Sequence, residues 1–203
     1  MTIKTPEEIA ILLEGGRRLA AILDFLKKEV RPGVKTKNLD ILAEKLILEA
    51  GAEPSFKGYK SARDKFPYPA SICVSIDDEV VHGLPSERIL KEGDIVGLDI
   101  GIKYKGLYTD MAETVVVGIT DEVGRKLIKV SRDSLYLAIS KVRDGIKVGD
   151  IGWTIQSYVE SNGFGVVRKL VGHGVGYEVH EEPEIPNFGN RQEGQALKEN
   201  MVI

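Results

Sequence analysis

The sequence contains a single cysteine, Cys73, among its 203 residues, so the chain cannot form an internal disulfide. A chain without disulfides is typical of a reducing compartment, and we expect a cytoplasmic protein. Long apolar runs are also missing, because nothing approaches the roughly 18 apolar residues that a membrane-spanning helix requires. The first residues lack the basic and then apolar pattern of a signal peptide. We therefore expect neither a membrane segment nor a targeting signal.

An excess of positive charge is absent as well. The chain has 28 Lys and Arg residues against 31 Asp and Glu residues, which gives a net charge of -3. Domains that bind nucleic acids are usually basic, so direct nucleic-acid binding is not predicted. The sequence has neither the Gly-x-x-x-x-Gly-Lys-Ser/Thr loop of nucleotide-binding proteins nor the Gly-x-Ser-x-Gly turn of serine hydrolases. These absences argue against three large classes of function.

Clear start and stop signals predict two helices early in the chain. Thr5-Pro6-Glu7-Glu8 is a capping box with proline at the first helical position, which predicts a helix over residues 6–29. A second helix is expected over residues 36–50, because its apolar residues recur at helical spacing. It is followed by Gly51, at the position where glycine commonly ends a helix.

The rest of the chain combines short β-branched runs with two further helical patterns. We expect strands over residues 71–75, 95–102 and 114–117, helices over residues 121–142 and 149–162, a loop over residues 52–69, and an extended segment over residues 201–203. Cys73 lies in an apolar strand pattern and is interpreted as a buried structural cysteine rather than a nucleophile.

A weak internal repeat relates the two parts of the chain. The matching segments are Val30–Lys35 with Val142–Lys147, Val81–Pro85 with Val179–Pro183, and Leu90–Glu92 with Leu197–Glu199. Chance similarity and shared turn chemistry are the alternative explanation. Because the matches occur in the same order, we favour two similar α+β halves, residues 5–118 and 119–203. We expect the halves to pack about a pseudo-twofold axis with a site between them.

Two aspartates are candidates for metal ligands. Asp99 and Asp110 lie on either side of Tyr104-Lys105-Gly106, which has the composition of a hairpin turn. Such a turn would place them at nearby positions on adjacent antiparallel strands. The neighbours of Asp99 are apolar, an unfavourable environment for a charge unless it binds a cation or strong donors. Solvated turn acids, or a hydrogen-bonded buried acid, are the alternative interpretation.

All three histidines lie in short motifs. His173 is surrounded by glycines in Gly172–Gly176, where the backbone can approach a ligand closely, and His180 opens His180-Glu181-Glu182-Pro183. Each motif alone is weak, and a turn histidine would be the default interpretation. Together with the two aspartates, His173 indicates an oxygen-rich metal site with one imidazole, a set that suits Mn, Fe, Co or Zn.

The order and spacing of these motifs resemble those of type I methionine aminopeptidases. The segments that carry the resemblance are Val81–Pro85 with His82, the pair Asp99 and Asp110, Gly172–Gly176, and His180–Pro183. The resemblance covers essentially the whole chain from the first helix onward. It implies the α+β pita-bread fold, with two pseudo-twofold-related halves around a curved antiparallel sheet. Residues 1–203 would then be a single peptidase domain that lacks its last strands.

The resemblance also implies an activity, which is removal of the initiator methionine from nascent proteins by a hydrolase with two divalent metal ions. Asp99 would bind one metal ion, Asp110 would bridge both, and His173 would bind the other. The implied residues in contact with substrate are His82 and His180, which would stabilise the reacting amide, and Tyr68 and Cys73, which would line the pocket for the methionine side chain.

Two departures from the family pattern leave alternatives. Val179 occupies a position that is usually aromatic, and the segment Gly172–His180 is also similar to Xaa-Pro aminopeptidases, which share the fold and the metal site. His82-Gly83-Leu84-Pro85 favours the methionine enzyme. A binding protein on the same fold that has lost its metal site is a hypothesis from another class, and the retained aspartates and histidines speak against it.

The family's two glutamate ligands do not occur within the sequence. The repeat places the counterpart of Asp99 beyond Ile203, so we expect the chain as given to be inactive. The partners that the resemblance implies are the N-terminal methionine of nascent peptides and the ribosome. We expect a monomer.

Overall fold

The computed structural model describes residues 2–61 and 65–203. Residues 62–64, which belong to the loop expected over residues 52–69, lie outside the described part. None of the described helices combines the length and the apolar run that crossing a membrane takes.

The chain divides into two compact units. The central unit comprises Ala10–Asp121, and the terminal unit comprises Met1–Ile9 together with Glu122–Ile203. Each unit has its own cluster of buried apolar side chains. The halves expected from the repeat, residues 5–118 and 119–203, stay a prediction.

Helices α1 (Pro6–Glu29) and α2 (Thr36–Glu49) form where their end signals predicted them. At the start of α1, the Glu8 N–H donates to the Thr5 hydroxyl over 3.2 Å, and the Thr5 N–H donates to the Glu8 carboxylate over 2.8 Å. This reciprocal pair satisfies two of the backbone donors that a helix leaves exposed at its first turn. After α2, Gly51 has a φ of 69°, which glycine adopts without strain.

The central unit contains an antiparallel sheet of β1 (Glu53–Pro54), β2 (Ile72–Ile76), β3 (Ile95–Tyr104) and β4 (Leu107–Val116). Strand β4 pairs with β3 along its whole length, while β1 and β2 pair with different parts of β3. Lys105 and Gly106 connect β3 to β4 with φ values of 48° and 86°, the backbone of a two-residue hairpin turn. The expected hairpin is therefore confirmed.

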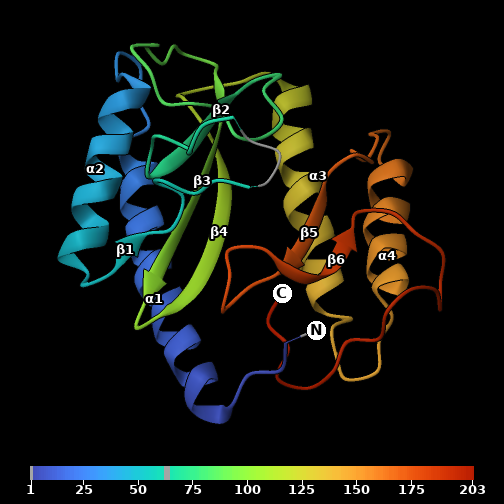
Figure 1. Ribbon diagram of the computed structural model, residues 1–203. Coiled ribbons are helices and arrows are strands. Elements are labelled where there is room, and N and C mark those ends of the chain that lie inside the picture. The colour runs from blue at the N-terminus through green and yellow to red at the C-terminus, as the bar shows by residue number, and fades with distance from the viewer. Residues whose placement is uncertain (1, 62–64) are drawn as a thin grey trace. The chain divides into compact units, whose positions relative to one another are not determined.

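Apolar faces of α1 and α2 cover this sheet, as Figure 1 shows. Leu19, Leu23 and Leu26 recur at helical spacing on α1, so they share one face of the helix, and all three are buried. On β3, Leu98 and Ile100 are fully buried, and Asp99 lies between them in the sequence. The packing of these residues in the core therefore fixes the position of the strand that carries Asp99.

The terminal unit contains α3 (Glu122–Ile139), α4 (Val148–Ser161), β5 (Val171–Gly174) and β6 (Glu181–Pro186). Helices α3 and α4 pack against each other, and α4 packs against β6 (Figure 1). Strands β5 and β6 form a two-stranded antiparallel sheet with an irregularity between His173 and Gly174.

Some strands differ from those expected from the sequence. Strand β4 begins at Leu107 rather than at residue 114, because pairing with β3 extends it through polar residues. Strand β6 was not expected, since its sequence is rich in Glu and Pro, which are poor strand formers. Residues 201–203, expected to be extended, belong to no helix or strand, and the Val175 N–H donates to the Val202 carbonyl over 3.1 Å.

The segments of the internal repeat make matching backbone contacts, each within its own unit. Gly33 and Gly145 donate to the carbonyls of Leu90 and Leu197, both over 2.9 Å, and these leucines donate back to Val34 and Ile146, both over 2.8 Å. In each case the contact lies just before a 14-residue helix, α2 or α4. The sequence similarity between these segments thus corresponds to a shared local structure.

Candidate metal and substrate site

The two predicted aspartates lie on neighbouring strands of the central unit. In the register of the sheet, Asp99 on β3 is opposite Ala112, and Asp110 on β4 is opposite Gly101. Because Asp99 and Gly101 are two residues apart on β3, both carboxylates project from the same face as diagonal neighbours. The expectation that the hairpin brings the two aspartates to adjacent strands is confirmed.

Burial and like charge make this pair unfavourable when both groups are ionised. Burial raises the pKa of Asp99 to about 7, and the charge of Asp110 and a hydrogen bond between the two carboxyl groups act in the same direction. A divalent cation would relieve the repulsion, and carboxylate oxygens are suitable ligands for it. The pair therefore fits a metal ion.

Two carboxylates do not by themselves complete a metal site. Across residues 2–61 and 65–203, no group of three or more His, Cys, Asp or Glu side chains is arranged to hold a metal ion. The assignment of Asp99, Asp110 and His173 as one ligand set therefore stays a prediction.

Gly101 is a residue of this site that the sequence analysis missed. A Cβ atom at this position would lie 2.3 Å from the Ser55 Oγ and 2.9 Å from the Phe56 ring, far inside contact distance. Only glycine therefore fits opposite Asp110. A glycine inside an apolar strand often marks such a close approach, and that signal was available in the sequence.

Tyr68 and Cys73 lie close together beside the carboxylate pair. Cys73 on β2 pairs with Asp99 in the sheet register and is 4% exposed. Burial, opposed by a hydrogen bond with Tyr68 and reinforced by the charges of Asp99 and Asp110, raises the pKa of Cys73 to about 12. The thiol therefore stays protonated, which is consistent with a structural role rather than a nucleophile.

The hydroxyl of Tyr68 is held by backbone carbonyls. It lies 3.1 Å from the Ile72 oxygen and 3.2 Å from the Gly83 oxygen. Burial, together with the hydrogen bond to Cys73, raises the pKa of Tyr68 above its ordinary range. Tyr68 thus links β2 to the loop that carries His82.

His82 lies on the loop after β2, with its side chain exposed and a φ of 60°. Its neighbour Gly83 lies against the strand, because a Cβ atom there would be 2.2 Å from the Val74 oxygen. Two hydrogen bonds hold this contact: the Val74 N–H donates to the Gly83 carbonyl over 2.8 Å, and the Gly83 N–H donates to the Ser75 hydroxyl over 3.1 Å. The loop therefore fixes His82 next to β2.

The other two predicted histidines meet in the terminal unit. The ring centroids of His173 and His180 are 4.4 Å apart, and their planes are inclined by 65°. The His173 Nδ1 lies 2.9 Å from the Gly174 carbonyl oxygen. A proton on Nδ1 would donate to that oxygen and leave the lone pair on Nε2, as in metal-binding imidazoles.

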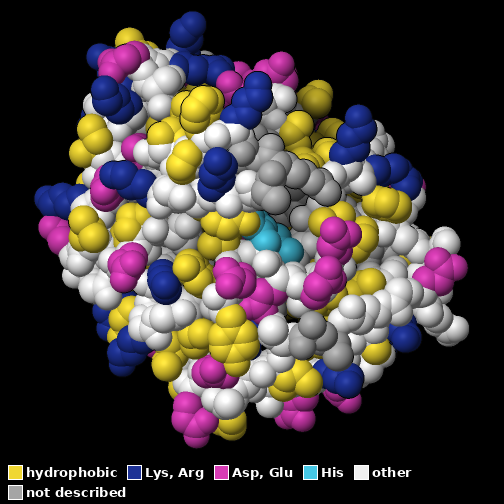
Figure 2. Space-filling model, in the orientation of Figure 1, with side chains coloured by type: hydrophobic (Ala, Val, Ile, Leu, Met, Phe, Trp, Pro, Cys, Tyr) yellow, Lys and Arg dark blue, Asp and Glu magenta, His cyan; other side chains and the backbone are white. Residues whose placement is uncertain are grey.

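His82 and His180 are exposed, and Figure 2 shows histidine side chains at the molecular surface. His173 is partly buried. Within the central unit the structure brings together Asp99, Asp110, Cys73 and Tyr68. Within the terminal unit it brings together His173 and His180.

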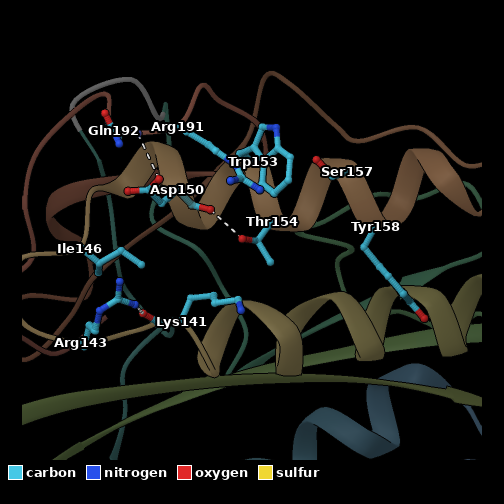
Figure 3. Close-up of a pocket in the computed structure, with 10 residues that line it drawn as sticks. All are labelled: Lys141, Arg143, Ile146, Asp150, Trp153, Thr154, Ser157, Tyr158, Arg191 and Gln192. Carbon is cyan, nitrogen blue, oxygen red and sulfur yellow. Dashed lines mark hydrogen bonds between the residues drawn. The ribbon is translucent and has the colours of Figure 1, made fainter.

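A separate pocket in the terminal unit contains none of the predicted residues. It has a volume of about 620 Å³ and lies along α4, where Figure 3 shows the side chains of Asp150, Trp153 and Tyr158. The guanidinium of Arg191 covers the Trp153 ring at 3.5 Å from its centroid. The predicted residues thus mark a different part of the molecule.

Comparison with known proteins identifies the family. The model for metallopeptidase family M24 matches residues 10–203. Methionine aminopeptidase 1 of Bacillus subtilis (strain 168) is 45% identical over 200 residues, which cover 98% of this chain and 78% of that protein. The crystal structure of methionine aminopeptidase from Thermotoga maritima has a TM-score of 0.94 and 42% identity, covering 99% of this chain and 79% of that one.

The fold extends to a second group of enzymes. The prolidase from Pyrococcus furiosus has a TM-score of 0.83 at 24% identity and covers 98% of this chain but 55% of that one. At that identity the likeness shows the fold alone, so the Xaa-Pro alternative has less support than the methionine enzymes. The expected α+β pita-bread fold is confirmed. The chain belongs to metallopeptidase family M24, within the group of methionine aminopeptidases.

Proposed function

We propose that this chain is a metal-dependent aminopeptidase that removes the initiator methionine from nascent proteins. The observation that carries the proposal is 45% identity to a methionine aminopeptidase over 98% of the chain. The contact between Asp99 and Asp110 supports it, because a repulsive pair of carboxylates is a suitable partner for divalent cations.

Membership of a metallopeptidase family implies divalent metal ions. We propose two ions, for which Asp99 and Asp110 would supply carboxylate ligands and His173 would supply an imidazole ligand. This mixture of oxygen and nitrogen donors is compatible with Co, Mn, Fe or Zn. Such a pair of ions, when bound, lowers the pKa of a coordinated water and stabilises charge on the attacked carbonyl.

His82 and His180 are proposed to contact the substrate rather than the metals. Both side chains are exposed, which suits groups that meet a peptide arriving from solvent. A protonated ring nitrogen can donate a hydrogen bond to the carbonyl oxygen of the reacting amide, where negative charge develops. Each histidine would therefore lower the barrier without holding a metal ion.

Tyr68 and Cys73 are proposed to line the pocket for the methionine side chain. The thiol of Cys73 is protonated near neutral pH, so it presents a small apolar surface. The hydroxyl of Tyr68 faces carbonyl oxygens of Ile72 and Gly83, which leaves its ring available for apolar contact. A thioether side chain is well matched to such a surface.

The test is a peptide panel assayed with saturating Co²⁺ or Mn²⁺, using this chain and the product of its complete reading frame. The product of the complete reading frame is expected to cleave Met-Ala-Ser and to leave Ala-Pro-Ser nearly untouched, whereas the 203-residue chain is expected to be inactive. A hydrophobic pocket separates similar side chains by only about 1 to 3 kcal/mol, so some cleavage of norleucine peptides is compatible. A preference for Xaa-Pro bonds would support the alternative enzyme. Metal-free protein without hydrolysis of any peptide would support the binding homologue.

Four further expectations stay predictions. They are the inactivity of the 203-residue chain, the monomeric state, the cytoplasmic location and an association with the ribosome. Comparing the turnover of the 203-residue chain with that of the product of the complete reading frame tests the inactivity. Sedimentation of the purified protein tests the monomeric state. Fractionation of cells tests the cytoplasmic location, and cosedimentation with ribosomes tests the association with the ribosome.

A further inference from the structure

Lys4 is a fully buried lysine in the terminal unit, with a side-chain exposure of 0%. Lysine is almost never buried in this way unless its charge is paired. The Lys4 Nζ lies 2.7 Å from the Glu181 Oε2 and donates to the Thr2 hydroxyl over 2.8 Å. It also lies 4.4 Å from the centroid of the Tyr177 ring. A carboxylate, a hydroxyl and an aromatic face thus surround the ammonium group.

Glu181 uses its two carboxylate oxygens for different purposes. Oε2 accepts hydrogen bonds from Lys4 and Thr2, whereas Oε1 accepts hydrogen bonds from the backbone N–H groups of Tyr177 and Glu178. Burial alone would raise the pKa of Glu181, but the hydrogen bonds from Lys4 and from the two backbone groups outweigh it and lower the pKa. The carboxylate therefore stays ionised at neutral pH and closes residues 177–181 into a loop.

This loop contains His180, directly before Glu181, and the His180 ring contacts that of His173. The fit between the loop and Lys4 is tight. A Cβ atom at Gly176, whose φ is 144°, would lie 2.3 Å from the Lys4 Cε. A side chain at position 176 would therefore displace the end of the Lys4 side chain, which shows how closely Lys4 packs against this segment.

A second set of contacts holds the N-terminal residues against the same loop. The Tyr177 hydroxyl donates to the Glu8 carboxylate over 2.6 Å, and Glu8 is also the acidic partner in the capping box of α1. The Lys4 N–H donates to the Asn200 carbonyl over 2.9 Å. Lys4 is therefore fixed by its own backbone as well as by its side chain.

We propose that Lys4 is a positioning residue for His180. Through Glu181, it holds the loop of residues 177–181 and thereby sets the His180 ring against His173. Buried ion pairs contribute little net stability compared with apolar side chains of similar volume, so stability alone does not account for this one. Directed hydrogen bonds, in contrast, select one loop geometry. The consequence for catalysis rests on the proposed substrate contact of His180, whereas the positioning itself does not.

The experiment uses two substitutions with different consequences. Lys4→Met keeps the length of the side chain but leaves the Glu181 carboxylate buried and unpaired. Adding Glu181→Gln removes that unpaired charge while its amide oxygen can still accept the loop N–H groups. The double variant should therefore regain thermal stability without regaining the tie to the N-terminal residues. Lys57→Met is the matched control, because Lys57 also makes a 2.7 Å ion pair, with Glu44, but is 47% exposed.

The main measurement is the through-space NMR contact between the rings of His173 and His180, which is simple to assign because the chain has three histidines. The unsubstituted chain and Lys57→Met should show the contact, and the double variant should lose it. In the product of the complete reading frame, kcat/KM for Met-Ala-Ser should fall at least tenfold in the double variant.

The two proposals fail in different ways. If the unsubstituted enzyme has no aminopeptidase activity but the ring contact depends on Lys4, the proposed function is wrong and the positioning role stands. If the unsubstituted chain lacks the ring contact, the positioning role is overturned. It is also overturned if the folded double variant keeps the contact and its kcat/KM stays within twofold.

Discussion

The two units each bury a carboxylate, but they accommodate its charge in opposite ways. In the central unit, Asp99 faces a second acid, Asp110, and its pKa is raised to about 7, chiefly by burial. In the terminal unit, Glu181 faces Lys4 and backbone N–H groups, and its pKa is lowered although burial opposes this. The charge of the first pair needs a proton or a cation to compensate it, whereas the charge of Glu181 is compensated by groups of the protein itself.

This difference distinguishes a carboxylate pair that can still bind a ligand from an ion pair that can only support the structure around it. Like charges placed together in a partly buried site are unfavourable for folding, and they are characteristic of functional sites. A fully satisfied ion pair has no remaining capacity to bind a ligand. This difference is why we propose a cation at the pair Asp99 and Asp110, and a support of loop geometry at Lys4 and Glu181.

The largest expected effect is on activity. In the product of the complete reading frame, Asp110→Asn should lower kcat/KM by at least about a hundred-fold, because loss of even an outer partner of a metal ligand typically costs 10- to 100-fold. Metal content of the purified protein should fall with it. His82→Ala is the control, since it should slow turnover while the metal content stays nearly unchanged. Normal metal content in Asp110→Asn, or loss of metal in His82→Ala, would contradict the assignment.

A smaller but measurable effect is expected on stability. Lys4→Met should lower the free energy of unfolding by about 3 to 5 kcal/mol, because it leaves a carboxylate buried without its partner. Lys57→Met, which removes an exposed ion pair, should cost about 0 to 1 kcal/mol. Urea denaturation at pH 7 compares the two. Equal losses would show that the burial of Lys4 has no special consequence.

The pH dependence of the metal-free protein should reveal both carboxylates with opposite signs. The raised pKa of Asp99 means that the folded state holds a proton that the unfolded state releases, so stability falls as the pH rises from about 4 to about 7. The lowered pKa of Glu181 contributes stability that is present above 4.5 and lost as the pH falls further.

Denaturation at several pH values checks this, with Asp99→Asn and Glu181→Gln as the informative variants. The first should flatten the profile between pH 4 and 7, and the second should flatten it at lower pH. If Asp99→Asn leaves the upper part of the profile unchanged, the pKa of Asp99 is not raised in the folded protein.

The smallest effect concerns the end of α1 that contacts Tyr177 through Glu8. Thr5→Ala should cost about 1 kcal/mol, the usual loss for a helix cap, and Thr5→Ser should cost less. Thermal unfolding measures both. A loss as large as that of Lys4→Met would mean that the capping box, rather than the buried ion pair, anchors the N-terminal residues.

Sequence signals located much of the candidate site because they are local. Tyr104-Lys105-Gly106 predicted a hairpin, and a two-residue turn determines the register of the strands it connects, so the neighbourhood of Asp99 and Asp110 followed. The close approach at Gly101 was missed. Its cause lies in Ser55 and Phe56, which are distant in the sequence and come near only through the pairing of β1 with β3.

By itself, the sequence determined the ends of α1, the turn between β3 and β4, and the motifs that indicate family M24. Each depends on backbone preferences or residue order within a few positions. Only the tertiary structure decided that Glu181–Pro186 is a strand and that Lys4 pairs with Glu181 beside His180. The first results from pairing that overrides poor strand propensity. The second joins residues 177 positions apart, and no local pattern around Lys4 distinguishes it from an exposed lysine.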